Sequence, residues 1–121
     1  MRVKKDIVKP SKHRRSFYDG DDLDRTYDWR CDECKESISV KLSTLQRASW
    51  SWVKDVSPEM QTLCNSHFSI TSDRAPDGGF TSVIFINCPD CGTKYMVYAG
   101  VNEYRNSVYA KTLQGLATLS A

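Results

Sequence analysis

The chain has 121 residues, of which 40% are hydrophobic and 26% are charged. This length and composition are typical of one small globular domain, and they exclude a collagen-like or wholly disordered chain. The longest apolar runs, residues 83–86 and 95–99, are far shorter than the ~20 residues of a membrane-spanning helix. No apolar stretch follows the basic N-terminal residues as it would in a secretory signal. We therefore expect a cytoplasmic protein that does not bind a membrane.

The net charge of +2 is distributed unevenly along the chain. Residues 1–15 contain seven Lys and Arg against one Asp, a net charge of +6, and residues 16–28 contain five Asp against one Arg, a net charge of −4. The first of these segments holds only three aliphatic side chains, too few to offset a backbone ordering cost of ~1–2 kcal/mol per residue. We predict that residues 1–25 form a largely mobile arm, basic and then acidic, and that residues 26–121 form a single domain.

The first cysteine pair, Cys31-Asp32-Glu33-Cys34, lies between two predicted strands. Residues 26–30 precede the pair. Residues 36–42 follow it and include apolar side chains at every second position from Ile38, which is the period of a half-buried strand. We therefore expect a β-hairpin that carries the cysteine pair in its turn.

The 53 residues between the two cysteine pairs leave room for a helical insertion at about residues 43–79. Residues 43–46 have the pattern of a capping box, and apolar residues over 45–56 recur at roughly helical spacing. A second helix is predicted to begin after Ser57 as N-cap, with Pro58 at the first helical position. Its apolar face comprises Met60, Leu63, Cys64, His67 and Phe68.

A second hairpin is predicted around the second cysteine pair, Cys88-Pro89-Asp90-Cys91. Residues 80–87 form a β-rich run before the pair, and residues 93–99 form a strand after it. Tyr95, Val97 and Ala99 should face one side of this strand, and Met96 and Tyr98 the other. Apolar residues over 103–114 favour a C-terminal helix that covers the sheet, with Gly115 as its C-cap. The predicted class is therefore α+β: an antiparallel sheet with a helical insertion and a C-terminal helix.

Two C-x-x-C pairs have the spacing with which four thiolates surround one metal ion. We predict one structural Zn²⁺ per chain, bound by Cys31, Cys34, Cys88 and Cys91. Gly92, directly after the second pair, suits the positive φ that such a turn requires. Two disulfides are disfavoured in a reducing compartment, and a thioredoxin-like motif would explain only one pair. An iron–sulfur centre also uses four cysteines, and spacing alone leaves it open.

The segments Trp29-Arg30-Cys31-Asp32-Glu33-Cys34 and Asn87-Cys88-Pro89-Asp90-Cys91-Gly92 resemble the two knuckles of the zinc-ribbon superfamily. The second, Cys-Pro-x-Cys-Gly, is the more specific motif. The resemblance covers residues 26–42 and 80–100, and it implies an antiparallel zinc-ribbon sheet and a metal site without implying an activity. The small size, near-neutral core and stand-alone ribbon are also similar to small bacterial accessory proteins, among them immunity proteins that neutralise toxins.

Signatures of catalytic sites are absent from the sequence, which contains no H-E-x-x-H, no H-x-E paired with P-C-x-x-C and no Walker A loop. Cys64 and His67 are neighbours on one helical face, where a nucleophile and its base are conceivable. A cysteine among apolar residues is, however, more typical of a core position. We therefore expect a protein that is not an enzyme.

Two classes of function remain, and they differ in the partner. The favoured class is a protein-binding module that inhibits its partner, as an immunity protein inhibits a toxin. The alternative is a nucleic-acid-associated zinc-ribbon protein whose basic segment, Arg2 to Arg15, contacts phosphates. We favour the first because residues 29–121 carry no net charge, whereas non-specific nucleic-acid binding depends on many Lys and Arg contacts.

The expected partner-binding face combines aromatic anchors with acidic side chains that would steer a basic partner. It comprises Trp50, Trp52, Asp19, Asp21, Asp22 and Asp24. The competing interpretation is that both tryptophans belong to the core and that the aspartates form a solvated turn.

Overall fold

The computed structural model describes residues 1–9, 15–18, 26–70, 74–75, 79–105 and 108–120, and for 15–18, 50–55, 103–105 and 108–110 only the course of the backbone. The elements follow in the order β1 (Arg2–Val8), β2 (Arg15–Tyr18), β3 (Thr26–Arg30), β4 (Ser37–Lys41), α1 (Leu42–Asp55), α2 (Pro58–Phe68), β5 (Phe80–Asn87), β6 (Lys94–Arg105) and β7 (Val108–Ser120). The class is α+β, as predicted.

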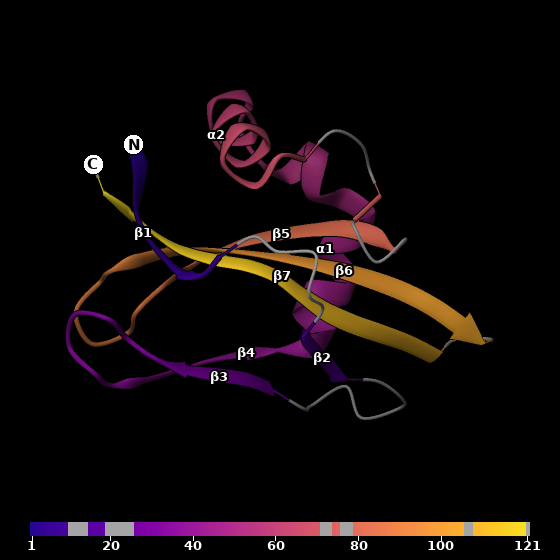
Figure 1. The fold of residues 1–121 in the computed structure, drawn as a ribbon, viewed down its shortest axis with the longest axis horizontal. Helices are drawn as coiled ribbons and strands as arrows, with labels where there is room; N and C mark the ends of the chain where they lie inside the picture. The colour runs from indigo at the N-terminus through magenta and orange to yellow at the C-terminus, as the bar shows by residue number, and fades with distance from the viewer. Residues whose placement is uncertain (10–14, 19–25, 71–73, 76–78, 106–107, 121) are drawn as a thin grey trace.

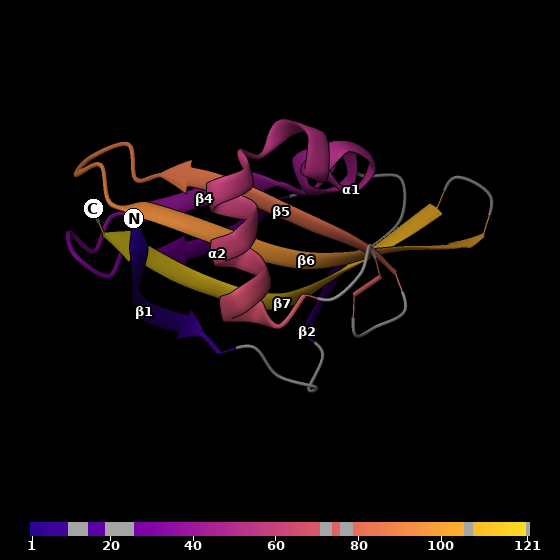
Figure 2. The ribbon, with the colours of Figure 1, turned by 90° about the horizontal axis from the view of Figure 1, so that it is seen from above.

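The strands form two antiparallel sheets that lie in separate layers (Figure 1). In the larger sheet the order is β1-β7-β6-β5, with β2 also pairing with β7, and in the smaller sheet β3 pairs with β4. Helix α2 lies on one face of the larger sheet and the β3–β4 hairpin lies on the other (Figure 1), while α1 runs beside the edge strand β5 (Figure 2). Neither described helix is long and apolar enough to cross a membrane.

Strand β6 separates two hydrophobic cores because its side chains alternate between the two faces of the sheet. The core on the side of β3, β4 and α1 contains Tyr95, Val97 and Ala99. The core on the side of α2 contains Met96 and Tyr98. The alternation predicted for this strand is therefore confirmed, and β6 is buried on both faces.

Helix α2 begins where the sequence predicts. Ser57 is extended, its Oγ accepts the N–H of Met60 at 3.3 Å, and Pro58 opens the helix. A helix is also confirmed over the predicted first segment, but α1 begins at Leu42. Ser43 therefore lies inside the first turn and does not cap it.

The predicted C-terminal helix is wrong, because residues 103–114 belong to β6 and β7. A β-bulge explains the misleading spacing. Tyr98 pairs with Gly115 and the next residue of β6 pairs with Leu113, so Gln114 is an extra residue in β7. A bulge shifts the phase of the strand, and consequently Leu113 and Leu116, three residues apart, enter the same core. Three-residue spacing is otherwise typical of a helix.

Gly115, predicted as a helix C-cap, instead lets α2 approach the sheet. It lies in the middle of β7, and a Cβ atom at this position would come within 2.6 Å of Cε1 of Phe68. The ring of Phe68 also lies 5.2 Å from the ring of Tyr98, the residue paired with Gly115 across the sheet. The glycine thus makes room for an aromatic contact between helix and sheet.

The prediction of an arm outside the domain is corrected for Arg2–Val8, which form β1 and pair with β7. The three aliphatic residues of this segment all pack against a core: Val3 on the α2 side, and Ile7 and Val8 on the other. The sheet edge also supplies backbone hydrogen-bond partners that an isolated segment lacks. Arg15–Tyr18 likewise pair with β7 as β2, and the rest of the predicted arm lies outside the described residues.

Candidate metal centre

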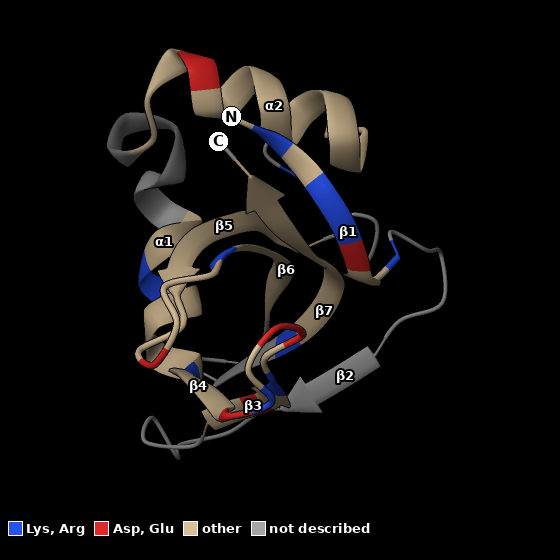
Figure 3. Cartoon of the chain, turned by 90° about the vertical axis from the view of Figure 1, so that its left-hand side faces the viewer, with Lys and Arg blue, Asp and Glu red and all other residues tan. Residues whose placement is uncertain are grey.

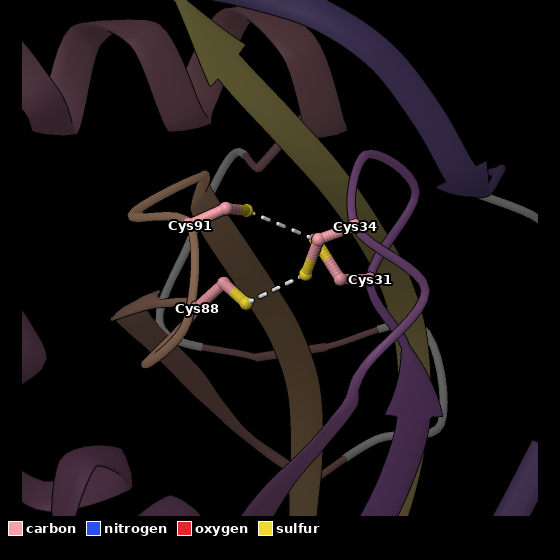
Figure 4. A group of neighbouring side chains, drawn as sticks. All are labelled: Cys31, Cys34, Cys88 and Cys91. Carbon is pink, nitrogen blue, oxygen red and sulfur yellow. Dashed lines mark hydrogen bonds between the residues drawn. The ribbon is translucent and has the colours of Figure 1, made fainter.

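The two cysteine pairs meet in space, each carried by its own hairpin (Figure 4). The turns of both hairpins lie at the same end of the molecule (Figure 1). The Sγ atoms of Cys31 and Cys91 lie 3.6 Å apart, those of Cys34 and Cys88 also lie 3.6 Å apart, and all four lie within 4.8 Å of one another. Tetrahedral zinc with Zn–S bonds of ~2.3 Å places its sulfur atoms roughly 3.8 Å from one another. The cluster therefore fits one zinc ion, and its thiols are free.

The two cysteine turns repeat one backbone pattern. In each, the N–H of the first cysteine donates to the carbonyl five residues on, at 2.8 Å in both turns. The residue directly after the pair donates back to the carbonyl of the first cysteine, at 3.0 Å in the first turn and 2.9 Å in the second. That residue is left-handed in both, with φ of 67° at Lys35 and 78° at Gly92. The role predicted for Gly92 is confirmed, and Lys35 adopts a conformation that is uncommon for a residue with a Cβ atom.

Hydrogen-bond donors around the sulfur atoms favour the thiolate form. Burial raises the pKa of the Cys31 thiol, but the backbone N–H of Cys34, the hydroxyl of Tyr95 and the backbone N–H of Glu33 outweigh burial and lower this pKa to about 6. The threonine two residues after Cys91 lowers the pKa of Cys91 through its hydroxyl and its N–H. Hydrogen bonds donated to a charged group stabilise that charged form.

The proximity of the four sulfur atoms opposes ionisation of all four thiols in the absence of a cation. The backbone N–H of Glu36 lowers the pKa of Cys34, but burial and the neighbouring sulfur atoms of Cys88, Cys91 and Cys31 raise it to about 12. Like charges at this separation oppose one another, and a bound divalent cation reverses that balance. Four thiolates in a closed shell are the donor set of a structural zinc site.

Tyr95 connects the larger sheet to the first cysteine turn. Its hydroxyl accepts the N–H of Asp32 at 2.8 Å and donates to Sγ of Cys31 at 3.3 Å. Its ring is fully buried and lies edge-on to the ring of Trp29, 5.5 Å away. In the sequence Tyr95 looked like one more apolar strand position. The one signal in the sequence was its hydroxyl, which needs a hydrogen-bond partner when it is buried among apolar residues.

The N-terminal strand also reaches the first cysteine turn, a contact that the sequence pattern did not indicate. Lys4 Nζ lies 2.6 Å from Glu33 Oε1, and Lys5 Nζ lies 2.8 Å from Asp32 Oδ1. Residues of both charge signs therefore lie along β1 and the first cysteine turn, on the side of the molecule that faces the viewer in Figure 3.

Cys64 and His67 do not face each other as nucleophile and base. Cys64 is fully buried and its Sγ lies 3.8 Å from Sδ of Met96. Burial raises the pKa of the Cys64 thiol to about 12. His67 Nε2 instead lies 2.6 Å from Asp6 Oδ1 and so links α2 to β1.

The residues of the predicted partner face are only partly covered by the structure. Trp50 and Trp52 lie in α1, with their side chains outside the described part. Asp19, Asp21, Asp22 and Asp24 lie outside the described residues altogether.

The chain has no match among the family models, curated proteins and solved structures with which it was compared. The fold and the site therefore define its class: an α+β protein with two cysteine knuckles that together fit one structural metal ion.

Proposed function

We propose that this protein is a non-enzymatic, zinc-stabilised binding module that acts by docking on another protein, as an immunity protein neutralises a toxin. The observation that carries the proposal is that two lysines of the N-terminal strand form ion pairs within the protein itself. Lys4 and Lys5 are paired with Glu33 and Asp32, so part of the basic segment compensates charges of the protein itself. This leaves fewer cations for phosphate contacts, on which nucleic-acid affinity depends.

The metal donor set supports a structural role for zinc. Catalytic zinc keeps an open coordination position beside three protein ligands, whereas four cysteines close a tetrahedral shell. The Cys64 thiol contacts Met96, and the His67 ring contacts Asp6. The two side chains are therefore not paired as a nucleophile and its base, which also favours a protein without nucleophilic catalysis. Cysteines that form no disulfide suit the reducing cytoplasm in which we expect the protein to act.

The proposed docking face is formed by Trp50 and Trp52 of α1 with the acidic run Asp19, Asp21, Asp22 and Asp24. Helix α1 lies beside the outermost strand, β5, on the flank of the molecule (Figure 2), where a partner can reach it. Neither the metal ligands nor the two hairpin turns use these residues. Aromatic anchors combined with acidic groups suit a basic partner, such as a toxin that acts on nucleic acid.

The experiment starts from the neighbouring genes, because an inhibitor of this kind is expected beside the gene of its target. Binding of the purified neighbouring protein is measured by calorimetry for the wild type, for Trp50→Ala and for Asp22→Lys. Asp90→Lys serves as the matched charge control, because Asp90 is exposed in the second cysteine turn. We expect at least tenfold weaker binding with unchanged melting for the first two variants, and wild-type affinity for the control.

The alternative is a nucleic-acid-associated protein that uses the rest of the basic segment between Arg2 and Arg15. It predicts tight binding to a labelled oligonucleotide at physiological salt, with an affinity that falls steeply as salt rises. That result, together with intact protein binding by Trp50→Ala and Asp22→Lys, would replace the first proposal with the second.

A further inference from the structure

We propose that β1 is a positioning element of the metal centre: Lys4 and Lys5 hold the first cysteine turn in its metal-binding conformation, and bound metal in turn favours docking of β1. The proposal depends on zinc occupying the four-cysteine cluster. It does not depend on the identity of any partner.

A bulge in β1 directs both lysines to the same neighbour. Val3 pairs with Leu119 of β7 and Lys5 pairs with Thr118, so Lys4 is an extra residue in the strand. Consecutive side chains of a regular strand point to opposite faces. A bulge re-aims side chains locally, and here the two consecutive lysines both reach the cysteine turn. Asp6, the next residue, contacts α2 through His67.

The partners of the two lysines are the two residues between the first pair of cysteines. Lys4 Nζ lies 2.6 Å from Glu33 Oε1, and Lys5 Nζ lies 2.8 Å from Asp32 Oδ1. A second contact holds the strand at the same point, because Oγ1 of Thr118 donates to the carbonyl of Lys5 at 3.3 Å. The side chains of β1 therefore bind the first cysteine turn, while its backbone is hydrogen-bonded to β7.

Asp32, the residue held by Lys5, is linked through Tyr95 to a metal ligand. The N–H of Asp32 donates to Tyr95, and the hydroxyl of Tyr95 donates to Sγ of Cys31. Partners of this kind orient the ligands of a metal site and tune its affinity. The conformation stabilised by Lys4 and Lys5 is thus the one in which Asp32 binds the hydroxyl that donates to Cys31.

The charges around the cluster explain why metal binding and the docking of β1 favour each other. Four thiolates and one Zn²⁺ sum to a charge of −2, and the carboxylates of Asp32 and Glu33 stand beside that anionic centre. The two lysines offset these carboxylates and so reduce the repulsion between the carboxylates and the anionic metal-bound cluster. Such coupling is reciprocal: if docked β1 strengthens metal binding, bound metal strengthens the docking of β1 by the same factor.

The expected effect is moderate, because both ion pairs are partly exposed, with side-chain exposures of 53% and 46% for the first and 57% and 25% for the second. Exposed pairs contribute little individually, whereas loss of an outer partner of a metal ligand weakens binding about 10–100-fold. We expect the variant with Lys4→Ala and Lys5→Ala to bind zinc roughly three- to tenfold more weakly than the wild type.

The test is a competition titration of zinc between the full-length protein and a chromophoric chelator. Lys9→Ala is the matched control, since Lys9 lies just beyond β1 and has no ion pair within the described part of the chain. Lys4→Glu alone should weaken zinc binding, and adding Glu33→Lys should restore it, because the reversed pair can form again. Amide exchange in the zinc-loaded protein should quicken at Val3 in the double alanine variant and stay unchanged at Tyr98.

Three results would overturn the proposal and leave the metal centre intact: zinc affinity of the double alanine variant within twofold of the wild type, an equal loss in Lys9→Ala, or no recovery with the reversed pair. A wild-type protein that binds no zinc would overturn it together with the metal centre itself. Zinc binding with unchanged affinity in the variant would reject only the role of β1.

Discussion

Replacing Tyr95 with phenylalanine removes one hydroxyl and keeps the ring packed against Trp29. The variant loses the hydrogen bond to Sγ of Cys31 and leaves the N–H of Asp32 without its acceptor. A hydrogen bond contributes ~0.5–1.5 kcal/mol net, and a donor left unsatisfied costs ~1–3 kcal/mol. The Asp32 N–H is only partly buried, so we expect a loss of about 2 kcal/mol in the free energy of unfolding. For a domain of this size that corresponds to a fall in Tm of about 8 °C.

The same substitution should weaken zinc binding about tenfold, because Cys31 loses a donor that stabilises its thiolate. Urea unfolding of the zinc-loaded protein measures the first effect, and chelator competition measures the second. Tyr98→Phe is the matched control on the same strand, since Tyr98 faces α2 on the opposite side of the sheet. Zinc affinity within twofold of the wild type for Tyr95→Phe, or an equal loss in Tyr98→Phe, would refute the proposed role of the hydroxyl.

Three further predictions concern the metal, the pH and the packing. Cys88→Ser should show no cooperative melting, and elemental analysis should find no bound metal. The reason is that structural zinc binding contributes ~10–16 kcal/mol, whereas the net stability of a whole domain is only ~5–15 kcal/mol. Cys64→Ala, the control, should retain one zinc ion. Acidification should release zinc, because protons compete with the metal for the four thiolates, and zinc retention at pH 4 would contradict this. In the metal-free protein the pKa of Cys31 is lowered from 9.0 to about 6, so the stabilising contribution of its thiolate is complete above 9.0 and is lost as the pH falls through 6. Gly79→Ala should destabilise the protein more than Gly115→Ala in urea unfolding, because the added Cβ would lie 2.7 Å from backbone atoms of Val101, whereas at Gly115 it meets the ring of Phe68, which can shift at a cost of ~1–3 kcal/mol.

The metal ligands and the elements around them could be predicted from the sequence, because their causes are local. Two residues between cysteines determine which thiols can reach one ion, and a serine followed by proline determines where α2 begins. The alternation of Tyr95, Val97 and Ala99 with Met96 and Tyr98 follows from the pleat of a single strand. Gly92 is likewise explained by the φ of its own residue. None of these features requires knowledge of what lies across the sheet.

The secondary structure of the N-terminal and C-terminal segments was decided by the tertiary structure alone. Strand β7 is covered on both faces and interrupted by a bulge at Gln114. Its apolar residues therefore do not alternate with a clear period of two, and their spacing predicted a helix instead. Arg2–Val8 look too polar to fold alone, but they become a strand because β7 offers backbone partners and Glu33, Asp32 and His67 offer side-chain partners. These partners are 27 or more residues away in the chain. The free energy that orders the N-terminal strand therefore comes from contacts that no local pattern records.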